Sequence, residues 1–587
     1  MLLNHSQAGS KQSAYALPMV LVFAAIGLIT LTAALDHSSQ SSVLTERRNQ
    51  LSRTINAAEA ASEKVLAQMQ HDFKADGERQ VRRRLRHYRS QIPSARESTL
   101  WNDYLFTDHL GRAGTHVSRV SSRQYVALNS KYQGLNGFAS TYRIVSNARE
   151  LTGRYPITNA VMQEVQLASI PVFQFAIFYN SLLEFTWAAP LTIRGRVHAN
   201  SNIYTGSSAP LRFTDNVTAT GIIKKRSWAG YQRSRMTGSI TYEGHRDTNV
   251  NSLTLPIGTN NTAAAVREIL KRPPVGESRN SPMGQQRFFN KAEMSIIVKN
   301  TGLQVQVKRP FDPTPTLISQ ADAGYFINTS KKFRDDRETK IVKVTEIDVA
   351  KFRTWAATNR EVIRKLGGDN PPNILYVEDT RRTRSSEMAG IRLVNGRRLP
   401  RRGLTVATPN PLYVKGHYNQ PRDSYLGTTN THNVKPASLV SDAVTIQSSN
   451  WRDGSLSSRG VPRTPSLRYR SATHTTINAA LLTGIVYAGG RDGRAPPSGG
   501  VVNYPRLLEN WGNGRRRLTI NGSIVNLFNS AQATAPFRRP GYYYYAPTRD
   551  FNFDPNFKDV AKLPPGTPEL RTLIRGKWKN LLPGRIN

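Results

Sequence analysis

The chain opens with a long apolar run and is polar and rich in β-forming residues over most of its remaining length. Residues 14–35 carry no charge and include YALPMVLVFAAIGLITLTAAL. A helix of about 20 apolar residues crosses a bilayer once. We therefore predict a leader over residues 1–13 and a transmembrane helix over residues 14–35. The predicted membrane-anchor side chains are Val20, Leu21, Ile26, Leu28 and Ile29.

The residues on either side of this run indicate its orientation. Lys11 precedes it, whereas Asp36 and a neutral Ser/Gln tract follow it before Arg47 and Arg48. Because positive charge collects on the cytoplasmic side, we expect an inner-membrane, single-pass protein with a cytoplasmic N-terminus and a periplasmic or extracellular bulk. A cleaved secretory signal peptide is the alternative, although its apolar region usually spans only about 7–15 residues.

A second helical pattern follows the apolar run directly. Residues 36–92 are predicted to continue the anchor as an amphipathic helix, which stops before Pro93. Its apolar positions recur near helical spacing and include Leu44, Leu51, Ile55, Ala58, Val65, Met69 and Phe73. Residues 93–171 alternate short mixed segments with turn-forming residues, and we interpret them as a connecting region.

From Val172 onward the hydrophobic pattern changes to short β-prone stretches separated by Gly, Asn and Asp. This rhythm predicts a first β-rich region over residues 172–260 and a second over residues 371–535, with the form of a β-solenoid or a sandwich. Between them, residues 261–370 are predicted to form a small α/β insertion. It contains a hairpin over residues 294–308 that turns at residues 300–302, a second hairpin over residues 331–347, and an amphipathic helix over residues 349–366. Residues 536–587 are predicted to be an extended C-terminal wrap that caps the last coils.

These elements together predict an α+β protein that is mainly β. It would have a long N-terminal helix, part in the membrane and part amphipathic, followed by a large β-rich head. At 587 residues the chain exceeds the size of a single core, so two or more packed units are expected. The sequence has no cysteine, which excludes disulfides, Cys-ligated zinc and a Cys nucleophile.

The net charge of +41 changes the picture of the head, because so basic a surface attracts polyanions such as DNA or acidic glycans. The alternative is an arginine bias of the whole organism, since the charges occur in every segment. The clusters that we predict to contact a polyanion are Arg82, Arg83 and Arg84; Lys224, Lys225 and Arg226; and Arg515, Arg516 and Arg517.

The sequence carries no recognisable catalytic motif: HExxH, GxSxG, Walker A and dinucleotide-binding patterns are all missing. Neighbouring carboxylates at 335–336, 378–379 and 550/554 are compatible with a polysaccharide-active enzyme on a β-helix. Flanking arginines favour charge compensation instead. His198 is interpreted as a structural histidine. We predict no enzyme activity, cofactor, metal site or small-molecule substrate.

Several stretches resemble known families once they are taken together. SAYALPMVLVFAAIGLITLTAAL followed by INAAEAASEKVLAQM resembles the start of PilX-like minor pilins and large type II secretion pseudopilins. The stretches GRVHANSNIYTG, SDAVTIQSSNW, TTINAALLTG and NYPRLLENW resemble large pilin-like proteins of bacteria such as Verrucomicrobia and Planctomycetes. The resemblance implies a membrane-embedded first helix and contacts with other pilin or pseudopilin subunits.

The leader departs from the pattern of these families. Prepilins carry a Gly before the cleavage point and a Glu five residues after it, whereas cleavage after Gly9 or Ser13 would place Ala14 or Pro18 there. In these families the tip pseudopilin lacks this glutamate. We therefore expect a non-enzymatic structural or adhesive subunit of a type IV pilus or type II secretion-like system, at the filament tip. A membrane-anchored enzyme and a passive envelope scaffold are the alternatives.

Overall fold

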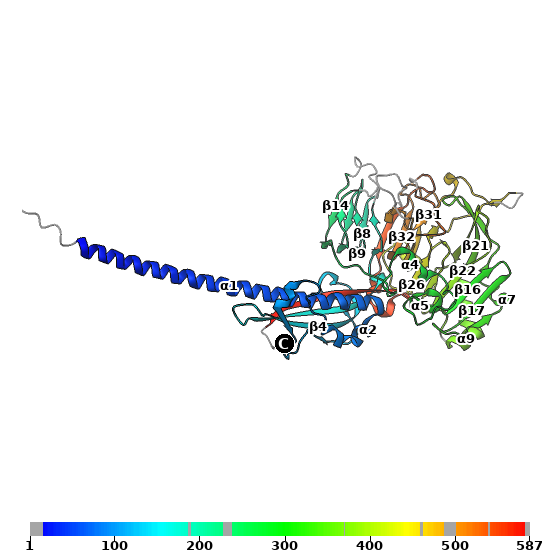
Figure 1. Ribbon diagram of the computed structural model, residues 1–587. Coiled ribbons are helices and arrows are strands. Elements are labelled where there is room, and N and C mark those ends of the chain that lie inside the picture. Colours follow the sequence, from blue (N-terminus) through cyan, green and yellow to red (C-terminus); the bar gives the residue numbers. More distant parts are fainter. Residues whose placement is uncertain are drawn as a thin grey trace, which may run out of the picture.

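The computed structural model describes residues 16–185, 189–226, 237–368, 370–457, 462–486, 500–537 and 541–581. Helix α1 (Ala16–Asp76) is 61 residues long and extends away from the rest of the protein (Figure 1). The predicted membrane helix and the amphipathic helix are therefore one continuous helix, as the two adjoining patterns indicated. The leader with Gly9 and Ser13 lies outside the described residues.

Helix α1 ends earlier than the sequence pattern predicted. The expected end was residue 92, but the helix stops at Asp76 and two short helices follow, α2 (Glu78–Arg83) and α3 (Leu85–Tyr88). Gly77 has a φ of 80°, in the left-handed region that favours glycine, and its N–H donates to the Phe73 carbonyl at 3.0 Å. The chain therefore turns at Gly77 rather than at Pro93.

The second half of α1 packs against an antiparallel sheet, visible beneath the helix in Figure 1. Val65, Met69 and Phe73 of the helix share one hydrophobic cluster with Tyr142 and Val165 of the sheet. The six strands of the sheet are β1 (Tyr104–Thr107), β2 (His116–Arg119), β3 (Gln124–Ala127), β4 (Asn136–Glu150), β5 (Thr158–Pro171) and β34 (Glu569–Leu581). The supposed connecting region thus supplies five of these six strands.

The whole head is inserted between two neighbouring strands of this sheet. β5 pairs antiparallel with β34, with Pro171 opposite Glu569 and Ala160 opposite Leu581. The chain leaves the sheet after β5 and returns to it only at β34. The C-terminal residues are therefore not simply a wrap over the last coils, because β34 completes the sheet that holds α1.

The first β-rich region forms a parallel coil of three faces. Val197 lies between Ile177 and Val217 on one face, and Leu211 lies between Leu191 and Ile240 on another. The first coils are 20 residues apart, as in the pair His198 and Thr218, and the last are 29 apart, as in the pair Asn216 and His245. The strands are β6 (Ile177–Tyr179), β7 (Leu183–Glu184), β8 (Leu191–Ile193), β9 (Val197–Ala199), β10 (Ile203–Tyr204), β11 (Leu211–Phe213), β12 (Val217–Ala219), β13 (Ile223–Lys224), β14 (Ile240–Tyr242) and β15 (Arg246–Asp247).

The second β-rich region is a larger parallel coil, and its coils differ in length. Thr405 and Ser438 of adjacent coils are 33 residues apart, Asn478 and Asn521 are 43 apart, and Asn521 and Asn552 are 31 apart. The strands are β22 (Ile374–Asp379), β23 (Glu387–Val394), β24 (Leu404–Ala407), β25 (Leu412–Lys415), β26 (Ala437–Ser441), β27 (Val444–Gln447), β30 (Thr475–Thr483), β31 (Arg506–Leu507), β32 (Arg517–Asn526) and β33 (Thr548–Phe553). A small antiparallel pair, β28 (Ser455–Leu456) and β29 (Pro462–Arg463), lies between β27 and β30 in the sequence.

The two coils meet at β32. Ile524 of β32 pairs with Ile177 of β6 on one side and with Leu481 of β30 on the other, and both pairings are parallel. Because β32 pairs with strands of both β-rich regions, one 13-stranded sheet runs through them. The parallel pairing identifies the head as a coiled, solenoid-like structure, one of the two forms that the sequence left open.

The predicted α/β insertion extends the end of the larger coil. β16 pairs with β22, and the expected hairpin turns between Lys299 and Gly302. The predicted helix after Val349 is broken at Asn359, whose side chain accepts hydrogen bonds from the next N–H groups and starts a second helix. The elements are α4 (Ala263–Arg267), α5 (Pro282–Gln286), α6 (Phe288–Lys291), β16 (Met294–Lys299), β17 (Gly302–Val307), β18 (Thr316–Ile318), α7 (Gln320–Gly324), β19 (Ile327–Asn328), β20 (Lys332–Asp335), β21 (Lys340–Asp348), α8 (Val349–Thr358) and α9 (Arg360–Leu366).

Candidate functional sites

The first half of α1 is a helix with an exposed apolar surface. The five predicted anchor side chains, Val20, Leu21, Ile26, Leu28 and Ile29, are each more than half exposed. Among the described residues, α1 is the helix that is long and apolar enough to cross a membrane. An apolar surface of this extent requires a lipid or protein partner to exclude water.

The helix enters the body of the protein at Gln50, its first buried residue. Gln50 Nε2 donates to the Tyr155 carbonyl at 2.6 Å, and its Oε1 accepts from the Tyr155 N–H at 3.1 Å. A Cβ at Gly153 would lie 2.0 Å from Gln50 Nε2, so glycine is required for this contact. At 1.5 Å per residue, the polar exposed segment between Leu35 and Gln50 spans about 20 Å.

The three predicted basic clusters lie on separate elements. Arg82 and Arg83 are exposed on α2, and Arg84 is partly exposed and pairs with the buried Asp72 at 2.9 Å. Lys224 ends β13, an edge strand of the first coil, and is followed by Lys225 and Arg226. Arg515, Arg516 and Arg517 are exposed at the start of β32, where Arg517 lies 3.6 Å from Asp550. Within the described part of the chain the three clusters lie on three different elements, and neither pocket described below brings two of them together.

A different set of cations converges where sequence reasoning did not place a site. The basic pocket, as we call it, has a volume of about 550 Å³ and lies between the loops that precede β24 and β26 and the segment after β33. Its charged and titratable lining residues are Arg401, Arg402, His432, Lys435, Asp554 and Lys562. Arg401 and Arg402 are neighbours in the chain, but the other cations come from distant segments.

The acid in the basic pocket, Asp554, accepts hydrogen bonds from a hydroxyl group and a main-chain N–H. Asp554 accepts from Thr431 Oγ1 at 2.9 Å and from the Asn556 N–H at 3.1 Å. Burial raises the pKa of Asp554, although these hydrogen bonds oppose the shift. The exposed Arg402, Lys435 and Lys562 side chains therefore give the pocket a positive surface.

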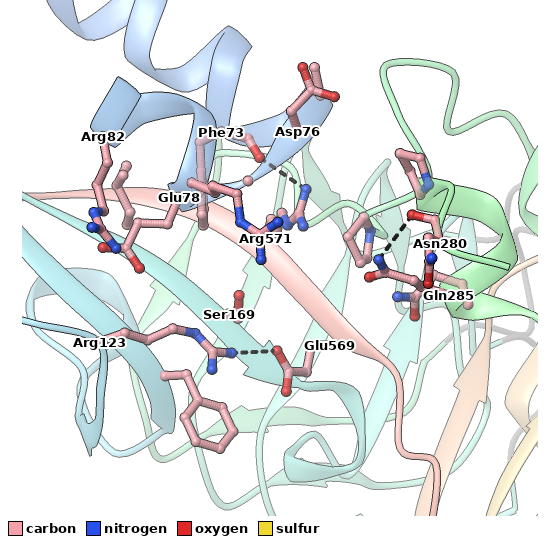
Figure 2. Close-up of a pocket in the computed structure, with 18 of the residues that line it drawn as sticks. Phe73, Asp76, Glu78, Arg82, Arg123, Ser169, Asn280, Gln285, Glu569 and Arg571 are labelled. Carbon is pink, nitrogen blue, oxygen red and sulfur yellow. Dashed lines mark hydrogen bonds and ion pairs between the residues drawn. The ribbon is translucent and has the colours of Figure 1, made fainter. Parts of the chain in front are cut away.

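A second pocket lies where the head meets the sheet that holds α1. We call it the junction pocket; its volume is about 760 Å³ (Figure 2). Its walls come from the end of α1 with α2, from the sheet, and from α5 of the head. The side chains labelled in Figure 2 are Phe73, Asp76, Glu78, Arg82, Arg123, Ser169, Asn280, Gln285, Glu569 and Arg571.

The junction pocket contains cations that burial has deprived of water. Arg571 Nη1 donates to the Phe73 carbonyl at 3.2 Å, and burial lowers the pKa of Arg571 to about 10. Lys291 Nζ donates to Gln286 Oε1 at 3.3 Å, and burial lowers the pKa of Lys291 to about 8. Arg123 pairs with Glu569 at 3.1 Å. The pocket thus holds partly buried positive charge that is only partly compensated.

The carboxylates considered for an enzyme are engaged in structural contacts. Glu378 contacts Arg272, and Asp379 pairs with Arg381 at 2.6 Å. Asp335 accepts from the Tyr413 hydroxyl at 2.8 Å, and Asp336 pairs with Arg470 at 2.8 Å. These contacts favour charge compensation over a catalytic role for these carboxylates. Among the described residues, no group of His, Asp and Glu has the arrangement of a metal site.

His198 has the position of a structural histidine. It is fully buried between coils, with Nδ1 2.8 Å from Thr218 Oγ1 and Nε2 3.0 Å from Asn200 Oδ1. Its ring stacks on Phe178, and burial lowers the pKa of His198 to about 4. The neutral imidazole therefore links adjacent coils.

Comparison with protein-family models gives no match for this chain. Comparison with curated proteins gives none either. Among solved structures, the chain is similar to the crystal structure of the competence-associated pilin ComZ from Thermus thermophilus, with 10% identity, coverage of 91% of this chain and 98% of that chain, and a TM-score of 0.28. This score is too low to establish a shared fold.

Proposed function

We propose that this protein is a non-enzymatic, pilin-like subunit of a type IV pilus or a type II secretion-like machine. The observation that carries the proposal is the two-part helix α1. Its first half exposes apolar side chains, and its second half packs on an antiparallel sheet. A helix of this kind has one half free to enter a bilayer or a bundle of like helices while the other half stays fixed to the body.

The proposed mechanism uses the same apolar surface twice. Val20, Leu21, Ile26, Leu28 and Ile29 first face lipid in the inner membrane, with the N-terminus in the cytoplasm and the head in the periplasm. During assembly these side chains exchange lipid for the helices of neighbouring pilin or pseudopilin subunits. Burial of each such side chain is favourable by about 1.5–3 kcal/mol relative to exposure to water, so the helix does not remain in solvent.

A tip position within the filament is part of this proposal. Cleavage after Gly9 or after Ser13 places no glutamate at the fifth position, the residue that tip pseudopilins also lack. Quantification of subunits in purified filaments tests this position. A tip subunit is present at a few copies per filament, whereas copies in proportion to filament length would contradict it.

Photo-crosslinking in the native host tests the helix contacts directly. A photoreactive residue at Ile26 should crosslink to the N-terminal helices of other subunits when the filament assembles. Leu317 of β18 is 66% exposed and is a matched control on the head, so a photoreactive residue there should not give these products. Lipid adducts alone at Ile26 in assembling cells would contradict the proposal.

The head is proposed to bind a polyanion through the basic pocket. Arg402, Lys435 and Lys562 are exposed there, and the adjoining carboxylate of Asp554 is held by Thr431 and Asn556. DNA and acidic glycans both supply the closely spaced negative charges that such a pocket attracts. The affinity should therefore fall steeply as the salt concentration rises.

A further inference from the structure

We propose that the junction pocket binds a small acidic carbohydrate, of one or two sugar units, that carries a carboxylate or a phosphate group. The pocket is formed jointly by the end of α1 with α2, by the sheet, and by the head (Figure 2). Its volume of about 760 Å³ falls within the range of small-molecule sites. The ligand would touch both the anchor-bearing part and the head.

The charge of the lining favours an anion. Five cations line the pocket, namely Arg79, Arg82, Arg123, Lys291 and Arg571, against Asp76, Glu78 and Glu569. Two of the three acids already have cationic partners: Glu569 pairs with Arg123 at 3.1 Å, and Glu78 pairs with Arg119 at 2.8 Å. The surplus charge that faces the cavity is therefore positive.

Two of these cations, Arg571 and Lys291, are partly buried and have no ion pair within 4 Å among the described residues. Arg571 donates to the main-chain carbonyl oxygens of Phe73 and Lys74, at 3.2 and 3.5 Å. Lys291 donates to the side-chain amide of Gln286. Burial lowers the pKa of both groups, which means that their positive charges are incompletely stabilised. An anion in the cavity would supply the missing compensation.

The aromatic lining favours a sugar over a nucleobase. The guanidinium of Arg123 lies 4.4 Å from the centre of the Phe138 ring, and that of Arg571 lies 5.7 Å from the centre of the Phe73 ring. One face of each ring is thus already occupied by a cation. The other polar groups of the lining suit hydroxyl groups, since they combine donors and acceptors; they are Ser169, Asn280, Gln285, Gln286 and Thr567.

Calorimetric titration of the full-length protein in detergent tests this proposal. The probes are digalacturonate and glucose 6-phosphate as acidic sugars, glucose as the neutral analogue, and inorganic phosphate as the bare anion. At least one acidic sugar should bind at least ten times more tightly than glucose and than inorganic phosphate. The two acidic probes distinguish a carboxylate ligand from a phosphate ligand.

A pair of neighbouring arginines supplies matched variants. Arg82 and Arg83 are both exposed on α2, but only Arg82 lines the pocket. Arg82→Gln should weaken binding of the acidic sugar at least fivefold, and Arg83→Gln should leave it unchanged. Because both side chains are exposed, neither change should impair folding.

A second measurement locates the bound probe. Hydrogen exchange should slow around Asn280 and Gln285 and around Arg571 when the acidic sugar is added, whereas β18 should be unaffected. Absence of binding, equal affinity for glucose, affinity for inorganic phosphate equal to that for the sugar, or equal loss in both arginine variants would each overturn the proposal.

Discussion

Arg571 donates from Nη1 to the carbonyl oxygen of Phe73 at 3.2 Å, although 498 residues separate the two along the chain. Arg571 lies on β34, the strand that returns from the head, and Phe73 lies in the last turn of α1. The contact places a cation at the C-terminal end of the helix, where the helix dipole and the free carbonyl groups favour positive charge. The return strand thereby fixes the end of the long helix.

Loss of this contact should loosen the end of α1. Arg571→Met is expected to cost about 1–3 kcal/mol locally, because it leaves carbonyl groups in a partly buried site without a donor. Hydrogen exchange of the full-length protein should therefore accelerate over the residues that precede Gly77. Arg575 on the same strand pairs with Glu63 of α1 at the exposed surface, so Arg575→Met is the control and should change exchange little. Equal exchange in both variants would contradict the role of Arg571.

A ladder of buried asparagines should stabilise the larger coil. Asn521 Nδ2 donates to Asn478 Oδ1 at 2.8 Å, and Asn552 Nδ2 donates to Asn521 Oδ1 at 3.1 Å. Asn521→Leu should destabilise the head by about 2–4 kcal/mol, because it leaves two buried side-chain amides without a hydrogen-bond partner. Asn370 is exposed, and Asn370→Leu should shift the thermal midpoint of the head much less. Equal midpoints for the two variants would contradict a stabilising ladder.

Glu509 should make the stability of the head depend on pH. Burial raises the pKa of Glu509 to about 7, although Ser448 and the nearby Arg470 and Lys415 oppose the shift. Between the usual glutamate value and about 7, the folded state binds more protons than the unfolded state. The stabilising contribution is therefore complete at acidic pH and is lost as pH rises through 7.

The change Glu509→Gln mimics the protonated form and tests this assignment. The variant should match the wild type near pH 4.5 and should unfold at a higher temperature than the wild type at pH 8. A midpoint difference that stays constant from pH 4.5 to pH 8 would rule out Glu509 as the titrating group.

A single lysine in the apolar half of α1 should disturb membrane insertion. A lysine at the centre of a transmembrane helix costs about 2.5–3.5 kcal/mol, so Ile26→Lys should increase the fraction of protein extracted from membranes by alkaline carbonate. Ser42→Lys lies in the exposed polar part of the same helix and should extract like the wild type. Equal extraction of Ile26→Lys and the wild type would contradict a membrane position for Ile26.

If the basic pocket binds a polyanion, the affinity for that polyanion should depend on salt through the pocket's own cations. Lys435→Gln should weaken binding of a DNA duplex and reduce the slope of log affinity against log salt by about 0.9, the value for one lost phosphate contact. Lys332 is exposed on β20, away from the pocket lining, so Lys332→Gln is the control. An unchanged slope in Lys435→Gln, with binding to acidic glycan also unchanged, would contradict a role for this pocket.

The sequence predicted those features that depend on neighbouring residues. The apolar run ending at Leu35 predicts one membrane-spanning helix, and the turn before Gly302 predicts a hairpin, because both signals are local. The irregular rhythm of short strands predicted a β-solenoid or a sandwich but not which strands pair. Coils whose spacing changes from 33 to 43 residues give no strict repeat in the sequence.

The sequence could not predict features that join distant segments. No local pattern indicates that Glu569 pairs with Pro171, so the C-terminal strand was interpreted as a wrap. The pockets have the same origin: Arg82, Lys291 and Arg571 come from three distant segments and meet only in the folded protein. Of the three predicted basic clusters, Arg82 alone lines either of the two pockets, because charge along a chain does not report convergence in space.

The mass of the mature N-terminus, measured after expression with and without a prepilin peptidase, tests the central claim most directly. A pilin-pathway subunit should lose its leader only when the peptidase is present, by cleavage after Gly9 or Ser13. An intact Met1 in the presence of an active peptidase that processes a control prepilin would contradict the account and would leave a membrane-anchored solenoid outside that pathway.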